Sequence, residues 1–152
     1  MEKFENTDDA LDFAIEQEIA AQNFYNDLAA KSAIPEMKRV FESFVFEEKG
    51  HQAKLQAIEG DRSFTATQPT AVQDLKLADY LVEVEPTPEM EYKDALVLAM
   101  KKEKAAYRLY IDLAGIADST EMKDTFLFLA NEEAKHKLRF EVEYDDIILQ
   151  ED

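Results

Sequence analysis

The feature that most constrains this chain is an internal repeat, which carries the same acidic motif twice at an offset of 85 positions. Glu48 and His51 in the first copy correspond to Glu133 and His136 in the second, so each copy holds a Glu-x-x-His motif. Further identical pairs at the same offset are Asp9/Asp94, Glu18/Glu103, Tyr25/Tyr110, Asp27/Asp112 and Phe41/Phe126. Two copies of this length predict a duplicated two-helix unit and not a solenoid, which needs shorter and more numerous repeats.

The Glu-x-x-His motifs point to metal binding. On an α-helix, residues three positions apart lie on the same face, so Glu48 and His51 face the same way, as do Glu133 and His136. A carboxylate oxygen and an imidazole nitrogen in this arrangement can bind one metal ion from a single helix. One such motif is a weak signal, because most pairs of this kind are solvated helix surface. Two motifs that hold both histidines of the chain are a stronger one.

Apolar residues recur at helical spacing in four segments, which predicts an all-α protein. We expect helices at about residues 9–33, 36–59, 91–118 and 120–146. Residues 61–90 have no counterpart in the repeat and are long enough to run the length of a bundle, so they predict a crossover between the second and third helices. The whole chain, 1–152, is therefore expected to form one four-helix bundle domain. The pattern does not decide whether residues 147–152 continue the last helix.

Local signals give expectations for the helix ends and for the crossover. Thr7 or Asp8 is expected to cap the first helix. Pro35 suits the first turn of the second helix, and Gly60 is expected to cap its C-terminal end. The stretch 71–81 predicts a short helix within the crossover.

Each predicted helix presents one glutamate within its apolar stripe. Glu18 and Glu103 interrupt the stripes of the first and third helices, where an ionised carboxylate is unfavourable unless it is paired or bound to metal. The alternative is that each glutamate sits at the edge of its stripe and reaches solvent. In a bundle with a long crossover, all six polar residues could converge at mid-height, and this glutamate and Glu-x-x-His inventory is that of a two-metal carboxylate site. The predicted ligands are Glu18, Glu48, His51, Glu103, Glu133 and His136.

Charge and ligand type narrow the choice of metal. Four carboxylates would balance two divalent ions, whereas without metal they would repel one another and some would take up protons. Oxygen ligands with one imidazole per metal suit iron or manganese better than structural zinc. We therefore expect two iron ions, with manganese or a mixed pair as alternatives.

Tyr25 and Tyr110 follow Glu18 and Glu103 by two helical turns on the same face. Two interpretations are open for them. Each could be a core tyrosine whose hydroxyl has found any acceptor, or each could donate a hydrogen bond to a metal-bound carboxylate.

Composition excludes several functional classes. The formal net charge of −17 argues against binding to nucleic acid or to an anionic membrane. It is explained either by solubility or by attraction of cations to an acidic surface. Cysteine is absent, which excludes disulfides, iron–sulfur clusters and thiol catalysis. The first residues contain no apolar signal segment, so a cytoplasmic location is expected.

With Glu18, Glu48-x-x-His51, Glu103 and Glu133-x-x-His136, the chain resembles the rubrerythrin branch of the ferritin-like superfamily. The resemblance covers residues 9–146 and implies a ferritin-like bundle with a di-iron site that reduces hydrogen peroxide. It also implies that Glu48 and Glu133 bridge the two metals, and that the other four residues are terminal ligands.

The chain differs from rubrerythrins in two respects. It lacks the four cysteines of a rubredoxin domain, so an external electron donor is expected. Rubrerythrins carry a further glutamate one turn after the third-helix ligand, where this chain has Ala106. With alanine at this position, the family's redox-linked exchange of glutamate against histidine would lack its carboxylate partner. We expect an enzyme that acts on peroxide or oxygen, and we expect a homodimer because the bundle is small and strongly apolar in pattern. The alternatives are a ferroxidase that detoxifies iron and a non-catalytic metal-binding or cargo protein.

Overall fold

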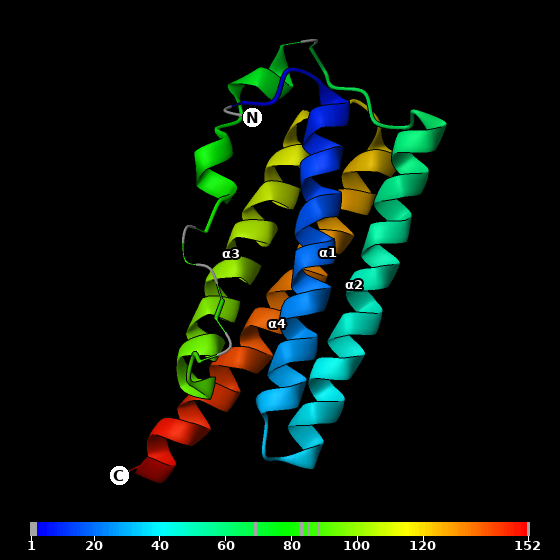
Figure 1. Cartoon of the computed structure of the whole chain (residues 1–152). Helices are drawn as coiled ribbons and strands as arrows, with labels where there is room; N and C mark the ends of the chain where they lie inside the picture. The colour runs from blue at the N-terminus through cyan, green and yellow to red at the C-terminus, as the bar shows by residue number, and fades with distance from the viewer. Residues whose placement is uncertain (1–2, 69, 83, 85, 88, 152) are drawn as a thin grey trace.

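Four long helices make up most of the structure, a computed structural model that describes residues 3–68, 70–82, 84, 86–87 and 89–151. They are α1 (Thr7–Lys31), α2 (Pro35–Asp61), α3 (Tyr92–Ile116) and α4 (Thr120–Glu151). Helices α1 and α2 pack as one antiparallel pair and α3 and α4 as the other (Figure 1). The predicted all-α four-helix bundle is confirmed. None of the described helices is both long enough and apolar enough to span a membrane.

The N-terminal cap of helix α1 is Asn6, which precedes both of the expected caps. The Asn6 side chain accepts a hydrogen bond of 2.9 Å from the backbone N–H of Asp9, which satisfies one of the free donors of the first turn. Thr7 and Asp8 lie inside the helix, so the predicted caps were wrong. An asparagine carbonyl fills the role as well as a hydroxyl or carboxylate, and it stood one position upstream of the residues considered.

The ends of α2 confirm one expectation and correct another. Pro35 is the first residue of the helix, where its missing N–H leaves no hydrogen bond unmade. Gly60 is not the cap, because the helix continues through Asp61 and ends at Arg62, which adopts the left-handed conformation with φ of 54°. Its backbone N–H bonds to the carbonyls of Ile58 and Glu59, so the closing turn forms around arginine without glycine.

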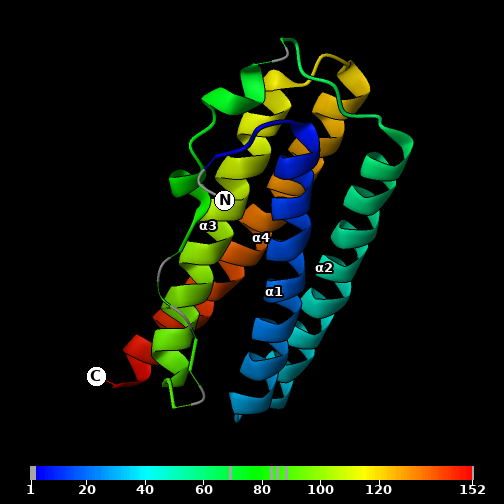
Figure 2. The same cartoon turned by 45° about the horizontal axis from the view of Figure 1, so that its top comes forward.

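The crossover runs from one end of the bundle to the other along α3 (Figures 1 and 2). In place of the single short helix expected at 71–81, it contains two 3₁₀ turns, η1 (Ala71–Asp74) and η2 (Leu77–Tyr80). Each turn is held by buried side chains, and the Tyr80 hydroxyl donates a 2.7 Å hydrogen bond to Asp112 on α3. Because α2 and α3 point in the same direction, the chain must return along the whole bundle before α3 can begin.

A short backbone pairing fastens the start of the crossover. Ala66 forms an antiparallel bridge with Ala117, in the connection between α3 and α4. The Thr65 hydroxyl adds a 2.6 Å hydrogen bond to Asp118. Helix α4 then continues through Glu151, so residues 147–151 extend the last helix, and Asp152 lies outside the described residues (Figure 1).

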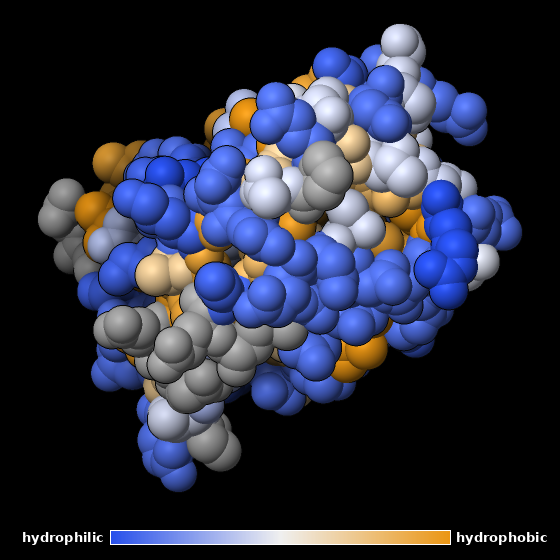
Figure 3. Space-filling view, turned by 90° about the horizontal axis from the view of Figure 1, so that it is seen from above, coloured by the Kyte–Doolittle hydropathy of each residue, from blue (hydrophilic) through white to orange (hydrophobic). Residues whose placement is uncertain are grey.

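Two apolar clusters fill the bundle, one toward each end. One contains Phe4, Leu55, Leu113 and Phe126, and the other contains Leu28, Phe41, Leu96 and Phe140, with further residues in each. The six predicted ligands lie between the two clusters in sequence on every helix, whereas the buried Glu143 follows Phe140 on α4. Seen from above, the end of the bundle where α1 begins is covered mainly by hydrophilic side chains (Figure 3).

Candidate metal centre

All six predicted ligands lie together in the interior of the bundle. Each is at most 4% exposed, and each of the four helices contributes at least one. They form two overlapping groups, within each of which the potential ligand atoms lie no more than 4.8 Å apart. One group is Glu18, Glu48, His51 and Glu133, and the other is Glu48, Glu103, Glu133 and His136. Glu48 and Glu133 belong to both groups, which is the arrangement that two bridging carboxylates require.

The polar atoms of this cluster lack ordinary hydrogen-bond partners. Among the described residues, seven buried side-chain atoms are without a hydrogen bond, and six of them come one each from the six predicted ligands. His51 Nδ1 lies 2.9 Å from a Glu133 oxygen and His136 Nδ1 lies 3.1 Å from a Glu48 oxygen, yet neither pair has hydrogen-bond geometry. Buried polar atoms without partners are rare in proteins. Because these residues form two close groups that share Glu48 and Glu133, the unpartnered atoms fit a site for two metal ions.

Burial and mutual repulsion keep part of the cluster protonated when metal is absent. Burial raises the pKa of Glu48 well above its usual value, and the negative charges of Glu133 and Glu18 raise it further. The same causes, burial first and then the charge of Glu133, raise the pKa of Glu103. Protons therefore replace part of the positive charge that metal would supply.

His51 and Glu133 form the charged pair of the metal-free cluster. Burial alone would lower the pKa of His51, but its close contacts with Glu133 and Glu18 outweigh burial and raise the pKa to about 10. Burial acts to raise the pKa of Glu133, but the contacts with His51 and Glu103 outweigh it and lower the pKa to about 2. Metal binding must displace the proton from His51, because only neutral imidazole can be a ligand.

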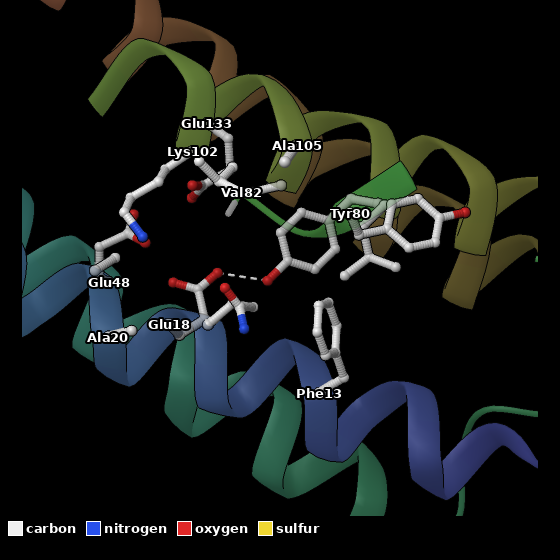
Figure 4. A pocket seen from close by; sticks show the side chains of 14 residues that line it. Phe13, Glu18, Ala20, Glu48, Tyr80, Val82, Lys102, Ala105 and Glu133 are labelled. Atoms are coloured by element: carbon white, nitrogen blue, oxygen red, sulfur yellow. Dashed lines mark hydrogen bonds between the residues drawn. The ribbon is translucent and has the colours of Figure 1, made fainter. Parts of the chain in front are cut away.

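The two tyrosines related by the repeat differ in their contacts. The Tyr110 hydroxyl donates a short hydrogen bond to Glu18, across from α3 to α1 (Figure 4). Tyr25 is equally buried, but among the described residues its hydroxyl makes no matching hydrogen bond to Glu103. Its ring instead meets the edge of the His136 ring. The arrangement supports the carboxylate-donor interpretation for Tyr110 and the core interpretation for Tyr25.

One residue at the site was not singled out from the sequence. A Glu47 carboxylate oxygen lies 2.5 Å from Nε2 of His136, the ring nitrogen that faces away from the acidic cluster. The available signal was its position directly before Glu48, together with a glutamate at the repeat-related position 132. Helix periodicity places Glu47 on the polar side of α2, so its contact with a neighbouring helix was not evident.

A small cavity opens onto the cluster between α1 and α3 (Figure 4). Glu18, Glu48 and Glu133 lie on its inner side, and Ala20, Ala21, Ala105 and Ala106 are among the residues that line it. Its free volume of about 30 Å³ has room for one or two water-sized molecules. The cavity thus gives a small molecule access to both groups of ligands at once.

The overlap of the two groups predicts different effects for shared and unshared ligands. Wild-type protein should bind two divalent ions per chain in a cobalt titration followed by absorbance. Glu18→Ala should lower the affinity for one of the two ions by more than about tenfold, whereas Glu48→Ala should lower the affinity for both. Glu48→Ala should also stabilise the metal-free protein at a pH above the raised pKa of Glu48, where it removes one of the repelling carboxylates. A wild-type stoichiometry of one ion or none would contradict the six-ligand assignment.

The raised pKa values predict that the metal-free protein loses stability as pH rises. The protonated forms of Glu48, Glu103 and His51 stabilise the folded state below their unfolded pKa values, and this contribution is lost as pH rises through the folded ones. The melting temperature should therefore fall between about pH 6.5 and pH 10, the interval set by His51. Saturating metal should raise it throughout, because the metal binds only the folded state.

Glu59 requires a control in this experiment. Its hydrogen bond with Asp12, with lesser effects of burial and charge, raises its pKa to about 7, so it acts in the same direction outside the cluster. The pH dependence should persist in Glu59→Gln and shrink in Glu48→Gln. A melting temperature that is flat or rising across the interval would show that the cluster is not protonated when metal is absent.

The different contacts of the tyrosines predict unequal effects of removing their hydroxyls. Tyr110→Phe leaves a buried oxygen of Glu18 without its donor and should destabilise the metal-free protein by about 1.5–3 kcal/mol. Tyr25→Phe is the matched control and should have a smaller effect. Chemical denaturation of both variants measures the difference, and equal losses would contradict the distinction between the two tyrosines.

Comparisons with known proteins agree with this geometry. The sequence model of the Rubrerythrin family matches residues 9–144. A hypothetical protein from Pyrococcus furiosus has a similar structure with a TM-score of 0.73 and 27% identity, covering 93% of this chain and 89% of that one. A Thermotoga maritima protein described as a ferritin-like diiron-carboxylate protein aligns with a TM-score of 0.71 and 19% identity, covering 92% and 94% of the two chains. No curated protein matches the chain.

The family match covers most of the chain, including all six residues of the buried cluster, and the fold is that of ferritin-like bundles. This chain belongs to the rubrerythrin family and has two buried carboxylate–histidine clusters consistent with a dinuclear metal site.

Proposed function

We propose that the protein is a di-iron enzyme that reduces hydrogen peroxide, or oxygen, with electrons from an external donor. The observation that carries this proposal is the set of six buried atoms without hydrogen-bond partners, one from each predicted ligand. A purely structural polar cluster would satisfy its own hydrogen bonds.

The donor set fits a pair of divalent ions. Four carboxylates and two imidazoles supply hard oxygen ligands with one nitrogen per metal, a set suited to iron or manganese. Two ferrous ions would supply the two electrons that reduce peroxide to water, and their charge would polarise the O–O bond.

The protein's own residues would hold, orient and shield the reactants. The cavity between α1 and α3 has room for a molecule of about the size of peroxide, and its alanine side chains limit the amount of water beside the carboxylates. Tyr110 holds Glu18 in place through its hydroxyl. The buried carboxylates offer sites for protons close to the reacting oxygens, which become water only after taking up protons.

The decisive experiment uses protein purified without oxygen, analysed for metal and then mixed rapidly with peroxide or with oxygen. In a redox enzyme, the bound iron should be oxidised in each turnover and should be reduced again by the added electron donor. A ferroxidase should instead accumulate ferric product, and a metal site that serves only stability should do neither. Absence of iron binding, or iron that neither oxidant oxidises, would overturn the proposal.

Ferroxidase activity is the second candidate, and Ala106 favours it. Ala106 lines the cavity one turn after Glu103, so the pocket has a small apolar wall where a carboxylate could otherwise add negative charge. Without that charge, the four carboxylates balance two ferrous ions, and the reduced state should react with oxygen as well as peroxide.

Ala106 therefore predicts weak discrimination between the two oxidants. Wild-type protein should oxidise readily with both, and Ala106→Glu should shift the ratio of rates toward peroxide by about tenfold, or roughly 1.4 kcal/mol in activation free energy. Ala106→Gln controls for size, and Ala21→Glu places the same charge at the repeat-related position beside Glu18. A wild-type preference for peroxide of many orders of magnitude would show that Ala106 is not the determinant.

The expected homodimer and external donor belong to the same proposal. Sedimentation of the protein at several concentrations tests the first. Re-reduction of the oxidised protein by candidate donors tests the second.

A further inference from the structure

The two histidines of the metal centre have different surroundings. The His136 ring stacks on Phe44, with centroids 4.0 Å apart and planes inclined by 26°. Tyr25 meets the same ring edge-on. Glu47 lies 2.5 Å from its Nε2, while its Nδ1 faces Glu48 and Glu103. The orientation of His136 is therefore set by contacts on its ring face, on its edge and at its outer nitrogen.

Among the described residues, His51 has no counterpart of the contacts that Phe44 and Glu47 make with His136. The residue related to Phe44 by the repeat is Leu129, and an aliphatic side chain cannot stack on a ring as phenylalanine does. The residue related to Glu47 by the repeat is Glu132, but a carboxylate oxygen of Glu132 lies 3.4 Å from Nζ of Lys135 and forms an ion pair with it. Among the residues that the structure describes, every ion-pair contact of His51 is made through Nδ1, on the side of the acidic cluster.

A single difference between the repeats explains why the two glutamates behave differently. Lys135 stands three residues after Glu132, a spacing that brings the two side chains together on one helix face. The corresponding residue after Glu47 is Gly50, which has no side chain to compete for the carboxylate. Glu47 is thus free to reach across to α4, where it and His136 line the same surface groove.

We propose that Glu47 is a positioning residue that orients His136 and makes the half-site of Glu48, Glu103, Glu133 and His136 the tighter of the two. A carboxylate on the outer nitrogen of a ligating histidine selects the tautomer with a free inner nitrogen and raises its basicity. No carboxylate of the described part of the chain gives the outer nitrogen of His51 such support. This inference rests on the proposed metal centre, and it adds that the two metals are bound unequally.

Zinc provides a redox-silent probe of this inequality. Titration of the full chain against a competing chelator should show two zinc ions with separated affinities. Glu47→Ala should lower the affinity for the more tightly bound ion by at least about tenfold. Glu47→Gln, which keeps a hydrogen-bond acceptor, should recover part of this loss. Glu132→Ala is the repeat-matched control and should leave both affinities near those of wild type.

The residues that follow the two glutamates permit a test in the opposite direction. A Cβ at Gly50 would meet nothing within 4 Å, so the helix accepts a side chain at this position, and Gly50→Lys introduces a competitor for Glu47. Gly50→Lys should lower the affinity for the more tightly bound ion, whereas Gly50→Ala, which controls for helix propensity, should leave this affinity unchanged. Lys135→Ala should release Glu132 from its ion pair and raise the affinity for the more weakly bound ion.

Proton NMR of the zinc-loaded protein separates positioning from a general structural role. The Nε2–H of His136 should give a downfield signal protected from exchange, and this signal should be lost in Glu47→Ala while the fold is retained. Equal zinc affinities in wild type, or a Glu47→Ala variant with unchanged affinities, would overturn the inference. The di-iron proposal would survive either result, but a chain that binds no zinc, iron or manganese would remove both.

Discussion

Four carboxylates buried at the middle of a four-helix bundle are the constraint on which this structure depends. Each would be unfavourable alone, and together they repel one another. The metal-free protein relieves this repulsion with protons on Glu48 and Glu103 and with a charged pair between His51 and Glu133. The same arrangement leaves one unpaired atom on each ligand. The bundle thus maintains an acidic interior that protons neutralise in part and that two divalent cations would neutralise fully.

The two apolar clusters make this arrangement possible. One packs on each side of the acidic layer and supplies the stability that the layer itself does not. The crossover is held against the bundle by the Ala66–Ala117 bridge and by the hydrogen bond between Tyr80 and Asp112. The ligand positions therefore depend on contacts distributed along the whole chain.

Much of this arrangement was predictable because repetition reveals which residues share a role. The helices, the crossover and the gathering of six polar residues follow from apolar spacing and from the offset of the two Glu-x-x-His motifs. Periodicity could not reveal contacts that depend on how neighbouring helices are rotated. Glu47 looked like a surface residue, and Tyr25 and Tyr110 looked equivalent, yet their contacts differ. The predicted caps of α1 and α2 were wrong because neighbouring residues looked equally suitable as caps. Asn6 and Arg62 are the residues that satisfy the free backbone groups at these helix ends.

The duplication has a consequence for symmetry. Each two-helix unit holds three ligands of one group and borrows the fourth from the other unit, so a single unit could complete its site only by pairing with a second copy. In a pair of identical chains, any substitution would appear on both sides of the two-fold axis. Joining both units in one chain removes that restriction. Phe44 can then differ from Leu129, and Gly50 from Lys135, so that one gene encodes two metal environments that can be tuned separately.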